Sequence, residues 1–172
     1  AALDANTTGT ENTAIGSYAL SDNSTGSGNT AVGRESLANN TTAGENVAVG
    51  KLSMYTTTTG GNNVAVGTQA LRLNTTGASN TAVGHYALRE NTTPSYNTAV
   101  GRQALRYGTT GGSENTAVGF QAGYLTNSVA NVAIGVRALH QNSTGDSNVA
   151  IGYEAGKNLT PNNSTLIGVQ AA

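Results

Sequence analysis

A five-residue motif, Asn-Thr/Val-Ala-Val/Ile-Gly, recurs along the whole chain at a nearly constant spacing. Successive motifs lie 17 residues apart, except for gaps of 18 and 16 around residues 101–135 and a gap of 16 before the last one. A fixed period of this kind predicts that residues 1–172 form one array of stacked repeats and not several domains. The motifs end at Gly16, Gly33, Gly50, Gly67, Gly84, Gly101, Gly119, Gly135, Gly152 and Gly168.

The full repeat reads N-T-A-V-G-x-x-A-L-x-x-N-T-T-G-x-x, and residues 80–96 show it almost intact, with Pro94 where glycine is usual. One insertion falls in the loop Thr110-Gly111-Gly112-Ser113, and the next repeat is one residue short. The loop is therefore expected to tolerate changes in length while the motif stays in register. Neither end carries a polar capping repeat, so we expect a segment of a longer fibre or a unit that stacks end to end.

The composition excludes an ordinary globular core. Only 10% of the 172 residues are charged, Trp and Cys are absent, and Phe120 and Met54 are the single residues of their kinds. Bulky apolar side chains are too few for a compact globule, and the low charge argues against disorder. We expect a fold with a thin core and many hydrogen bonds.

The motif alternates β-branched with small residues, as a short strand does. We predict an all-β parallel solenoid, or β-roll, of about ten 17-residue coils, each with two short strands and two turns. The Val/Ile position never becomes polar and is assigned to the interior, with the Leu position filling it from the opposite wall. Asn and Thr are expected to form ladders from coil to coil, and association of several chains is expected to bury the Ala/Gly face.

The motifs Asn131–Gly135 and Asn148–Gly152 resemble the S/N-V-A-I-G motif of trimeric autotransporter adhesin heads. That resemblance implies a left-handed parallel β-roll in which three chains pack side by side. The longer 17-residue unit departs from those heads and is similar to repeats of phage tail fibres and related surface proteins.

No catalytic or metal-binding cluster is expected. His85 and His140 occupy different repeat positions, the acidic residues are scattered, and the glycines match no phosphate or dinucleotide motif. We predict that the chain is not an enzyme and needs no cofactor. The net charge of -1 argues against nucleic acid as a partner, and no apolar run is long enough to cross a membrane.

One column of positive charge stands out. Arg72, Arg89 and Arg106 follow the Leu position in three successive repeats, with His140 and Lys157 at that position further on. Stacked coils would place the three guanidinium groups along one edge as a candidate stripe for an anionic cell-surface glycan. In the other interpretation, the side chains extend into water or meet carboxylates such as Glu90. We favour this second interpretation over the glycan stripe. The seven tyrosines are expected at the surface or between chains.

These features predict a structural or adhesive fibre segment, a shaft or head that acts as a spacer, outside the cell, on its surface or on a virion. Self-association into a homotrimer or an end-to-end filament is the expected partnership. The alternative is an ice-binding solenoid that uses regular Thr and Asn ladders. Its interrupted threonine column comprises Thr13, Thr30, Thr81, Thr98 and Thr116.

Overall fold

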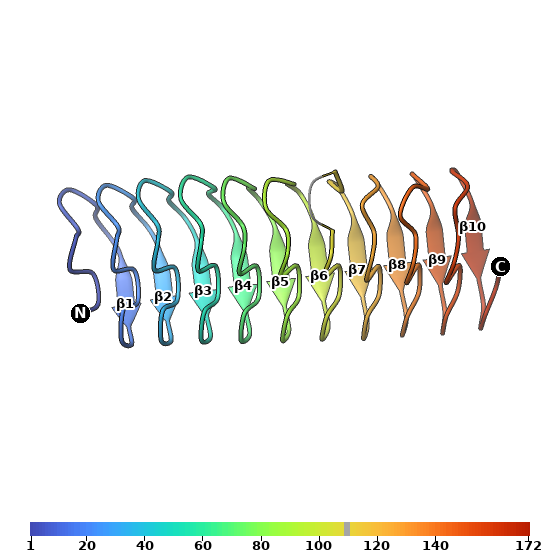
Figure 1. The fold of residues 1–172 in the computed structure, drawn as a ribbon, viewed down its shortest axis with the longest axis horizontal. Helices are drawn as coiled ribbons and strands as arrows, with labels where there is room; N and C mark the ends of the chain where they lie inside the picture. The colour runs from blue at the N-terminus through green and yellow to red at the C-terminus, as the bar shows by residue number, and fades with distance from the viewer. Residues whose placement is uncertain (109–110) are drawn as a thin grey trace.

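The computed structural model describes residues 1–108 and 111–172, which form a rod built from one parallel β-sheet (Figure 1). The ten strands stack in chain order along the long axis, and the two termini lie at opposite ends of the rod. No helix occurs in the described residues. The predicted all-β parallel solenoid is confirmed. The strands are β1 (Thr13–Ile15), β2 (Thr30–Val32), β3 (Val47–Val49), β4 (Val64–Val66), β5 (Thr81–Val83), β6 (Thr98–Val100), β7 (Thr116–Val118), β8 (Val132–Ile134), β9 (Val149–Ile151) and β10 (Thr165–Ile167).

The register places each repeat position above the same position of the next coil. Between β5 and β6, for example, Ala82 pairs with Ala99. The register also continues where the repeat length changes, because Ala99 pairs with Ala117 and Ala117 with Ala133. The prediction that the motif holds its register across the insertion is confirmed; residues 109–110, at the start of the insertion, lie outside the described residues.

Each coil contains one strand, so the prediction of two strands per coil is wrong. The segment around each Leu position runs through turns instead. After Gly67, the Ala70 N–H donates to the Gly67 carbonyl at 3.1 Å, and Gln69 and Leu71 adopt left-handed φ angles of 57° and 51°. Alternating N–H groups bond to the coils on either side: that of Gln69 donates to Lys51 and that of Leu71 to Ala87, each at 2.9 Å. These bonds replace a second β-ladder, so the backbone remains paired without strand geometry.

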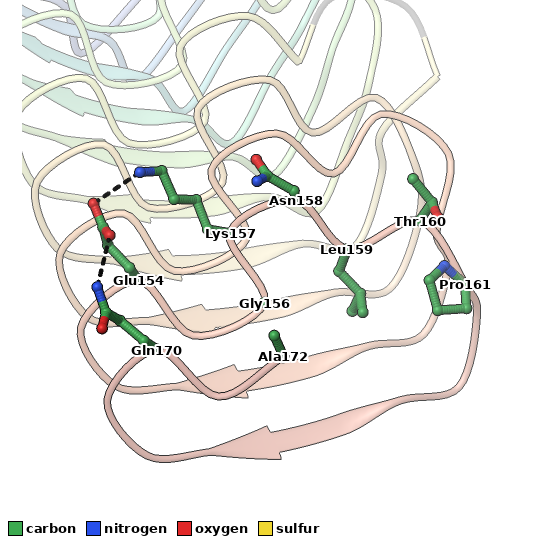
Figure 2. A pocket seen from close by; sticks show the side chains of 9 residues that line it. All are labelled: Glu154, Gly156, Lys157, Asn158, Leu159, Thr160, Pro161, Gln170 and Ala172. Carbon is green, nitrogen blue, oxygen red and sulfur yellow. Dashed lines mark hydrogen bonds and ion pairs between the residues drawn. The ribbon is translucent and has the colours of Figure 1, made fainter.

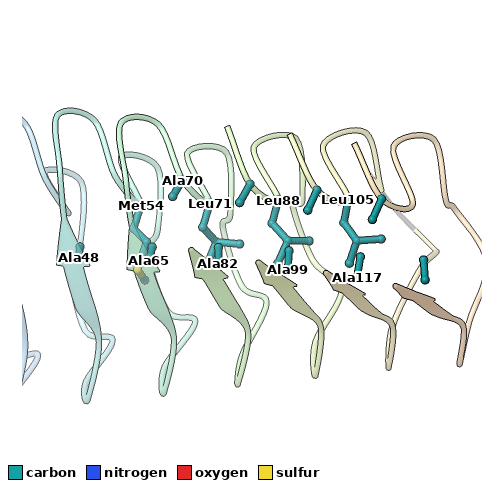
Figure 3. Close-up of a cluster of buried hydrophobic side chains, with 14 of the residues drawn as sticks. Ala48, Met54, Ala65, Ala70, Leu71, Ala82, Leu88, Ala99, Leu105 and Ala117 are labelled. Atoms are coloured by element: carbon teal, nitrogen blue, oxygen red, sulfur yellow. The ribbon is translucent and has the colours of Figure 1, made fainter. Parts of the chain in front are cut away.

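The interior is filled by the alanines of the strands and by the Leu positions (Figure 3). Leu71, Leu88 and Leu105 are buried and extend toward the strand alanines, and Met54 takes the Leu position of its coil. The prediction that the Leu position lies in the interior is confirmed, and the prediction that the Val/Ile position also lies there is wrong. Because alternate residues of a strand face opposite sides, a thin coil that holds leucine has room only for alanine across from it.

The Val/Ile and Thr/Val positions of the ten strands therefore point away from the core. Together they form a surface that we call the outer sheet face: the first and third residues of β1 to β10. Val66 and Val83 are 37% and 36% exposed, and Ile15 and Ile167 in the end strands are 61% and 69% exposed. The expectation that chain association buries an alanine face is also wrong, because those alanines lie in the chain's own core.

The buried asparagines hold neighbouring coils together. Asn63 is fully buried, and its side-chain oxygen accepts the backbone N–H of Asn80 in the next coil at 2.9 Å. Its amide donates to the Gly77 carbonyl at 2.9 Å, across the coil. Threonine hydroxyls follow the same rule, since Thr58 donates to the carbonyl of Thr75 at 3.2 Å. The predicted ladders are confirmed, and the main-chain groups of the next coil are frequent partners.

The motif glycine is required by both its conformation and its surroundings. Gly84 has a φ of +132°, and a β-carbon built there would lie 2.6 Å from the Gly101 carbonyl oxygen. A side chain at this position would therefore strain the backbone and clash with rigid main-chain atoms of the next coil.

Candidate functional site

The corner that follows each strand carries all eight Lys and Arg side chains of the chain, within the five residues after each motif glycine. The corner that precedes each strand carries Glu11, Glu45, Glu114 and Asp146 and no basic residue. The basic residues are therefore confined to one corner of the coil, whereas acidic residues occur at both, since Glu35, Glu90 and Glu154 also follow the strands. The basic residues are Arg34, Lys51, Arg72, Arg89, Arg102, Arg106, Arg137 and Lys157.

Three of these residues form what we call the arginine column: Arg72, Arg89 and Arg106. Their backbones are fixed by hydrogen bonds between coils, because the Leu73 N–H donates to the Arg89 carbonyl and the Glu90 N–H to the Arg106 carbonyl, each at 3.0 Å. The backbone pairing thus aligns the three arginines in successive coils, as predicted. Adjacent coils in a parallel sheet are about 4.8 Å apart, which sets the spacing of the column.

Tyrosines surround the arginine column and support its side chains. The guanidinium carbon of Arg106 lies 4.9 Å from the ring centre of Tyr86 and 4.8 Å from that of Tyr107. The guanidinium carbon of Arg89 lies 5.4 Å from the ring centre of Tyr86, and the guanidinium carbon of Arg72 lies 5.8 Å from the ring centre of Tyr55. Such contacts are favourable, because the faces of aromatic rings attract cations.

The expectation that these arginines extend into water or meet carboxylates is only partly correct. Arg89 forms an ion pair with Glu90, and its Nε donates to the Gln69 side-chain oxygen at 3.0 Å. Arg72 and Arg106 are partly buried, and no carboxylate of the described residues lies within ion-pair distance of either. Their Nε atoms are buried without a hydrogen-bond partner.

The close spacing of the arginines has an electrostatic consequence. Burial lowers the pKa of Arg89 from its ordinary value, and the positive charges of Arg72 and Arg106 lower it further. The guanidinium groups stay charged at neutral pH, because the ordinary pKa of arginine lies far above it. The middle of this corner is therefore a surface where positive charges repel one another and where an anion would be stabilised.

Sequence reasoning missed the gathering of tyrosines around the arginine column. Tyr55 occupies the repeat position of the arginines, one coil before Arg72, whereas Tyr86 and Tyr107 occupy two other positions. The turn brings these positions together, because its left-handed residues fold the chain back within a few residues. The signal in the sequence was the restriction of tyrosine and arginine to one stretch of the repeat, with Tyr96 as the exception.

The column continues beyond Arg106 with Tyr124, His140 and Lys157. The rings of Tyr124 and His140 stack at 5.0 Å between centres, and Tyr124 meets Tyr107 edge to face at 5.0 Å. Burial lowers the pKa of His140, and the neighbouring charges of Arg137 and Lys157 lower it further. His140 is thus a half-buried ring packed among aromatic and basic groups.

Glu154 joins the last two basic residues of this corner. It accepts hydrogen bonds from Lys157 at 3.1 Å and from Arg137 at 3.3 Å, and the bond from Lys157 is the main reason that its pKa is lowered. A pocket of about 410 Å³ opens beside it at the C-terminal end of the rod (Figure 2). Leu159 and Ala172 line this pocket, so it exposes part of the core at the last coil and contains no cluster of reactive groups.

Other kinds of site find no support in the part of the chain that the structure covers. Across residues 1–108 and 111–172 there is no group of three or more His, Cys, Asp or Glu side chains that could hold a metal ion. The same residues include no helix with the length and hydropathy to cross a bilayer. Comparison of the chain with protein-family models, with curated proteins and with solved structures finds no match.

Proposed function

We propose that this chain is a structural segment of an extracellular or virion fibre, in which it acts as a rigid spacer. The observation that carries the proposal is the continuous register of the ten strands, which persists across the one insertion. Each coil bonds to the coils before and after it, so the length of such a rod is set by the number of repeats.

The outer sheet face is the surface proposed for contact with further copies of the same chain. It carries no charged side chain in β1 to β10 and exposes valine and isoleucine along the length of the rod. A second copy presents the same residues at the same spacing, so the two faces can interdigitate without placing like charges together. The left-handed winding and the three-chain packing implied by the adhesin resemblance stay predictions.

Light scattering of the purified chain tests the self-association. We expect a mass of three chains, or of a larger end-to-end assembly. Replacing two outward residues by the double change Val66→Lys and Val83→Lys should reduce the mass toward that of one chain, because lysine charges would face each other across the contact. The matched control is Ser17→Lys and Thr68→Lys, at the corner where Lys51 already lies, and it should leave the mass unchanged. A monomeric parent chain would contradict self-association.

The second candidate function is ice binding, and a specific observation favours it. All Lys and Arg side chains lie at the corner after the strands, so the bulky charges that count against an ice-binding surface are absent from the outer sheet face. Thr30, Thr81 and Thr98 lie partly exposed on this face, as part of the interrupted threonine column. A thermal-hysteresis assay separates the two functions: a monomer with activity supports ice binding, and an oligomer without activity supports the fibre.

A further inference from the structure

We propose that the arginine column, Arg72, Arg89 and Arg106 with the rings of Tyr55, Tyr86 and Tyr107, binds a linear acidic polysaccharide that lies along the rod. The inference is independent of the spacer function, because it concerns a different surface and holds for a single rod or for an assembly of rods.

The first argument is an excess of positive charge in the middle of the rod. Between Glu45 and Glu114 the chain has one acidic residue, Glu90, against five basic residues. Glu90 pairs with Arg89, which leaves Arg72 and Arg106 without a carboxylate partner among the described residues. The net charge of the whole chain is -1, so this excess is local and is balanced by acidic residues nearer the ends. The five basic residues are Lys51, Arg72, Arg89, Arg102 and Arg106.

The second argument is that the arginine side chains are held in place before any ligand arrives. The side chain of Arg89 is 21% exposed and is fixed by Gln69 and Glu90. Arg106 lies against two tyrosine rings, and Arg72 lies against one. Long basic side chains normally lose much conformational freedom when they bind, so arginines that are already ordered bind at a lower entropic cost.

The third argument concerns the chemistry of the ligand. Guanidinium groups bind carboxylate and sulfate oxygens through paired N–H donors, which suits uronic acid and sulfated sugars. The backbone positions of the three arginines repeat at about 4.8 Å along the rod, so the matching ligand is an extended chain that carries several anions. A lone small anion would meet only one or two of the three arginines.

The rings also distinguish polysaccharide from single-stranded nucleic acid. Proteins that bind single strands stack the bases on open aromatic faces. Here the rings of Tyr86 and Tyr107 are in contact with arginine, and that of Tyr124 is stacked on His140. Bases would have to displace these contacts, whereas a sugar chain needs only the guanidinium groups and the outer edges of the rings.

Binding can be measured by titrating the folded chain with fluorescent heparin, which is sulfated, and with fluorescent polygalacturonate, which carries only carboxylates. Neutral dextran and oligo-dT serve as comparison ligands. The test variant replaces Arg72, Arg89 and Arg106 by serine. The control variant replaces Arg34, Lys51 and Arg102 by serine, which removes the same charge from exposed positions outside the column. Circular dichroism confirms that each variant is folded.

We expect the parent chain to bind at least one of the two acidic polysaccharides, with an affinity that falls as salt is added, because binding releases counterions. The test variant should lose about tenfold or more in affinity, and the control variant should stay within about threefold of the parent. Replacing the three arginines by lysine keeps the charge, removes the paired donors and should give an intermediate affinity, which keeps the proposal testable if the serine variant does not fold.

Three results would overturn the proposal. The first is no binding of heparin or polygalacturonate by the parent chain. The second is an equal loss of affinity in the test and control variants, which would mean unspecific attraction to net charge. The third is tighter binding of oligo-dT with the same dependence on the arginine column, which would assign the surface to nucleic acid.

Discussion

Single residues of the repeat are held by different physical constraints. The motif glycine is fixed by a left-handed φ and by the approach of the next coil, and the strand alanine is fixed by the space left beside leucine. The buried asparagine is fixed by its two hydrogen bonds, one to the next coil and one across its own coil. The loss of stability that a substitution causes should therefore depend on which constraint it breaks.

The change Gly84→Ala should destabilise the rod by about 2–4 kcal/mol, since it combines a strained φ with a clash against backbone atoms. The matched control is Gly61→Ala, where the next repeat already carries Ala78 and the φ lies outside the left-handed range. Its effect should stay within about 1 kcal/mol. Urea unfolding followed by circular dichroism measures both values, and equal effects of the two changes would contradict the account of the motif glycine.

His140 should make the stability fall as the pH is lowered below about 6.5. Because burial lowers its pKa in the folded state, the unfolded chain takes up a proton first, at its ordinary pKa of about 6.5. The stability that the neutral ring provides is complete above that pH and is lost progressively as the pH falls from there through the lowered pKa of the folded state. His140→Gln should therefore reduce the fall in melting temperature on acidification, and an unchanged pH dependence would show that this ring is not responsible.

The element of this fold is the coil, and the sequence alone predicts part of its structure. The period, the strand positions and the burial of Leu71 and its equivalents follow from the repeat, because a fixed spacing places like residues above one another. The repeat does not show which side of the strand faces inward, since alternation defines two faces without saying which one is inside. Volume decides it: alanine fits opposite leucine, and valine does not.

The turns and the candidate site show a second limit of sequence reasoning. Leu71 and Gln69 adopt left-handed conformations that neither residue type prefers, so no local preference indicates them. Hydrogen bonds to both neighbouring coils stabilise this backbone. The arginine column could be predicted because its members share one repeat position. Tyr55 shares that position and could be predicted with them, whereas Tyr86 and Tyr107 could not, because they occupy other positions that only the turn brings next to the column.

Removing one whole coil should leave the fold intact. Deletion of residues 68–84 joins Gly67 to His85 and restores the pairing of every repeat position, so the melting temperature should fall by no more than about 5 °C. Deletion of residues 68–76 joins Gly67 to Gly77 and places unlike positions above one another. That variant should unfold or aggregate. Circular dichroism and thermal melting distinguish the two, and comparable stability of both variants would contradict the strict register.

At the scale of the whole molecule, the coils form a rod with a different chemistry on each side. The outer sheet face is uncharged and β-branched, the corner after the strands is basic and aromatic, and the corner before them is acidic. This separation allows one surface to contact further copies while another stays available for a ligand. If the chain is a spacer, as we propose, it must also keep its shape when repeats are added.

Small-angle X-ray scattering of an extended chain tests that claim most directly. Joining residues 17–172 after Gly168 preserves the repeat register and adds nine strands. The account predicts an unchanged cross-section and a rod lengthened by roughly 43 Å, which is nine spacings of about 4.8 Å. Two bodies joined by a flexible hinge, or a cross-section that grows while the length stays constant, would contradict the proposal that this chain is a rigid spacer.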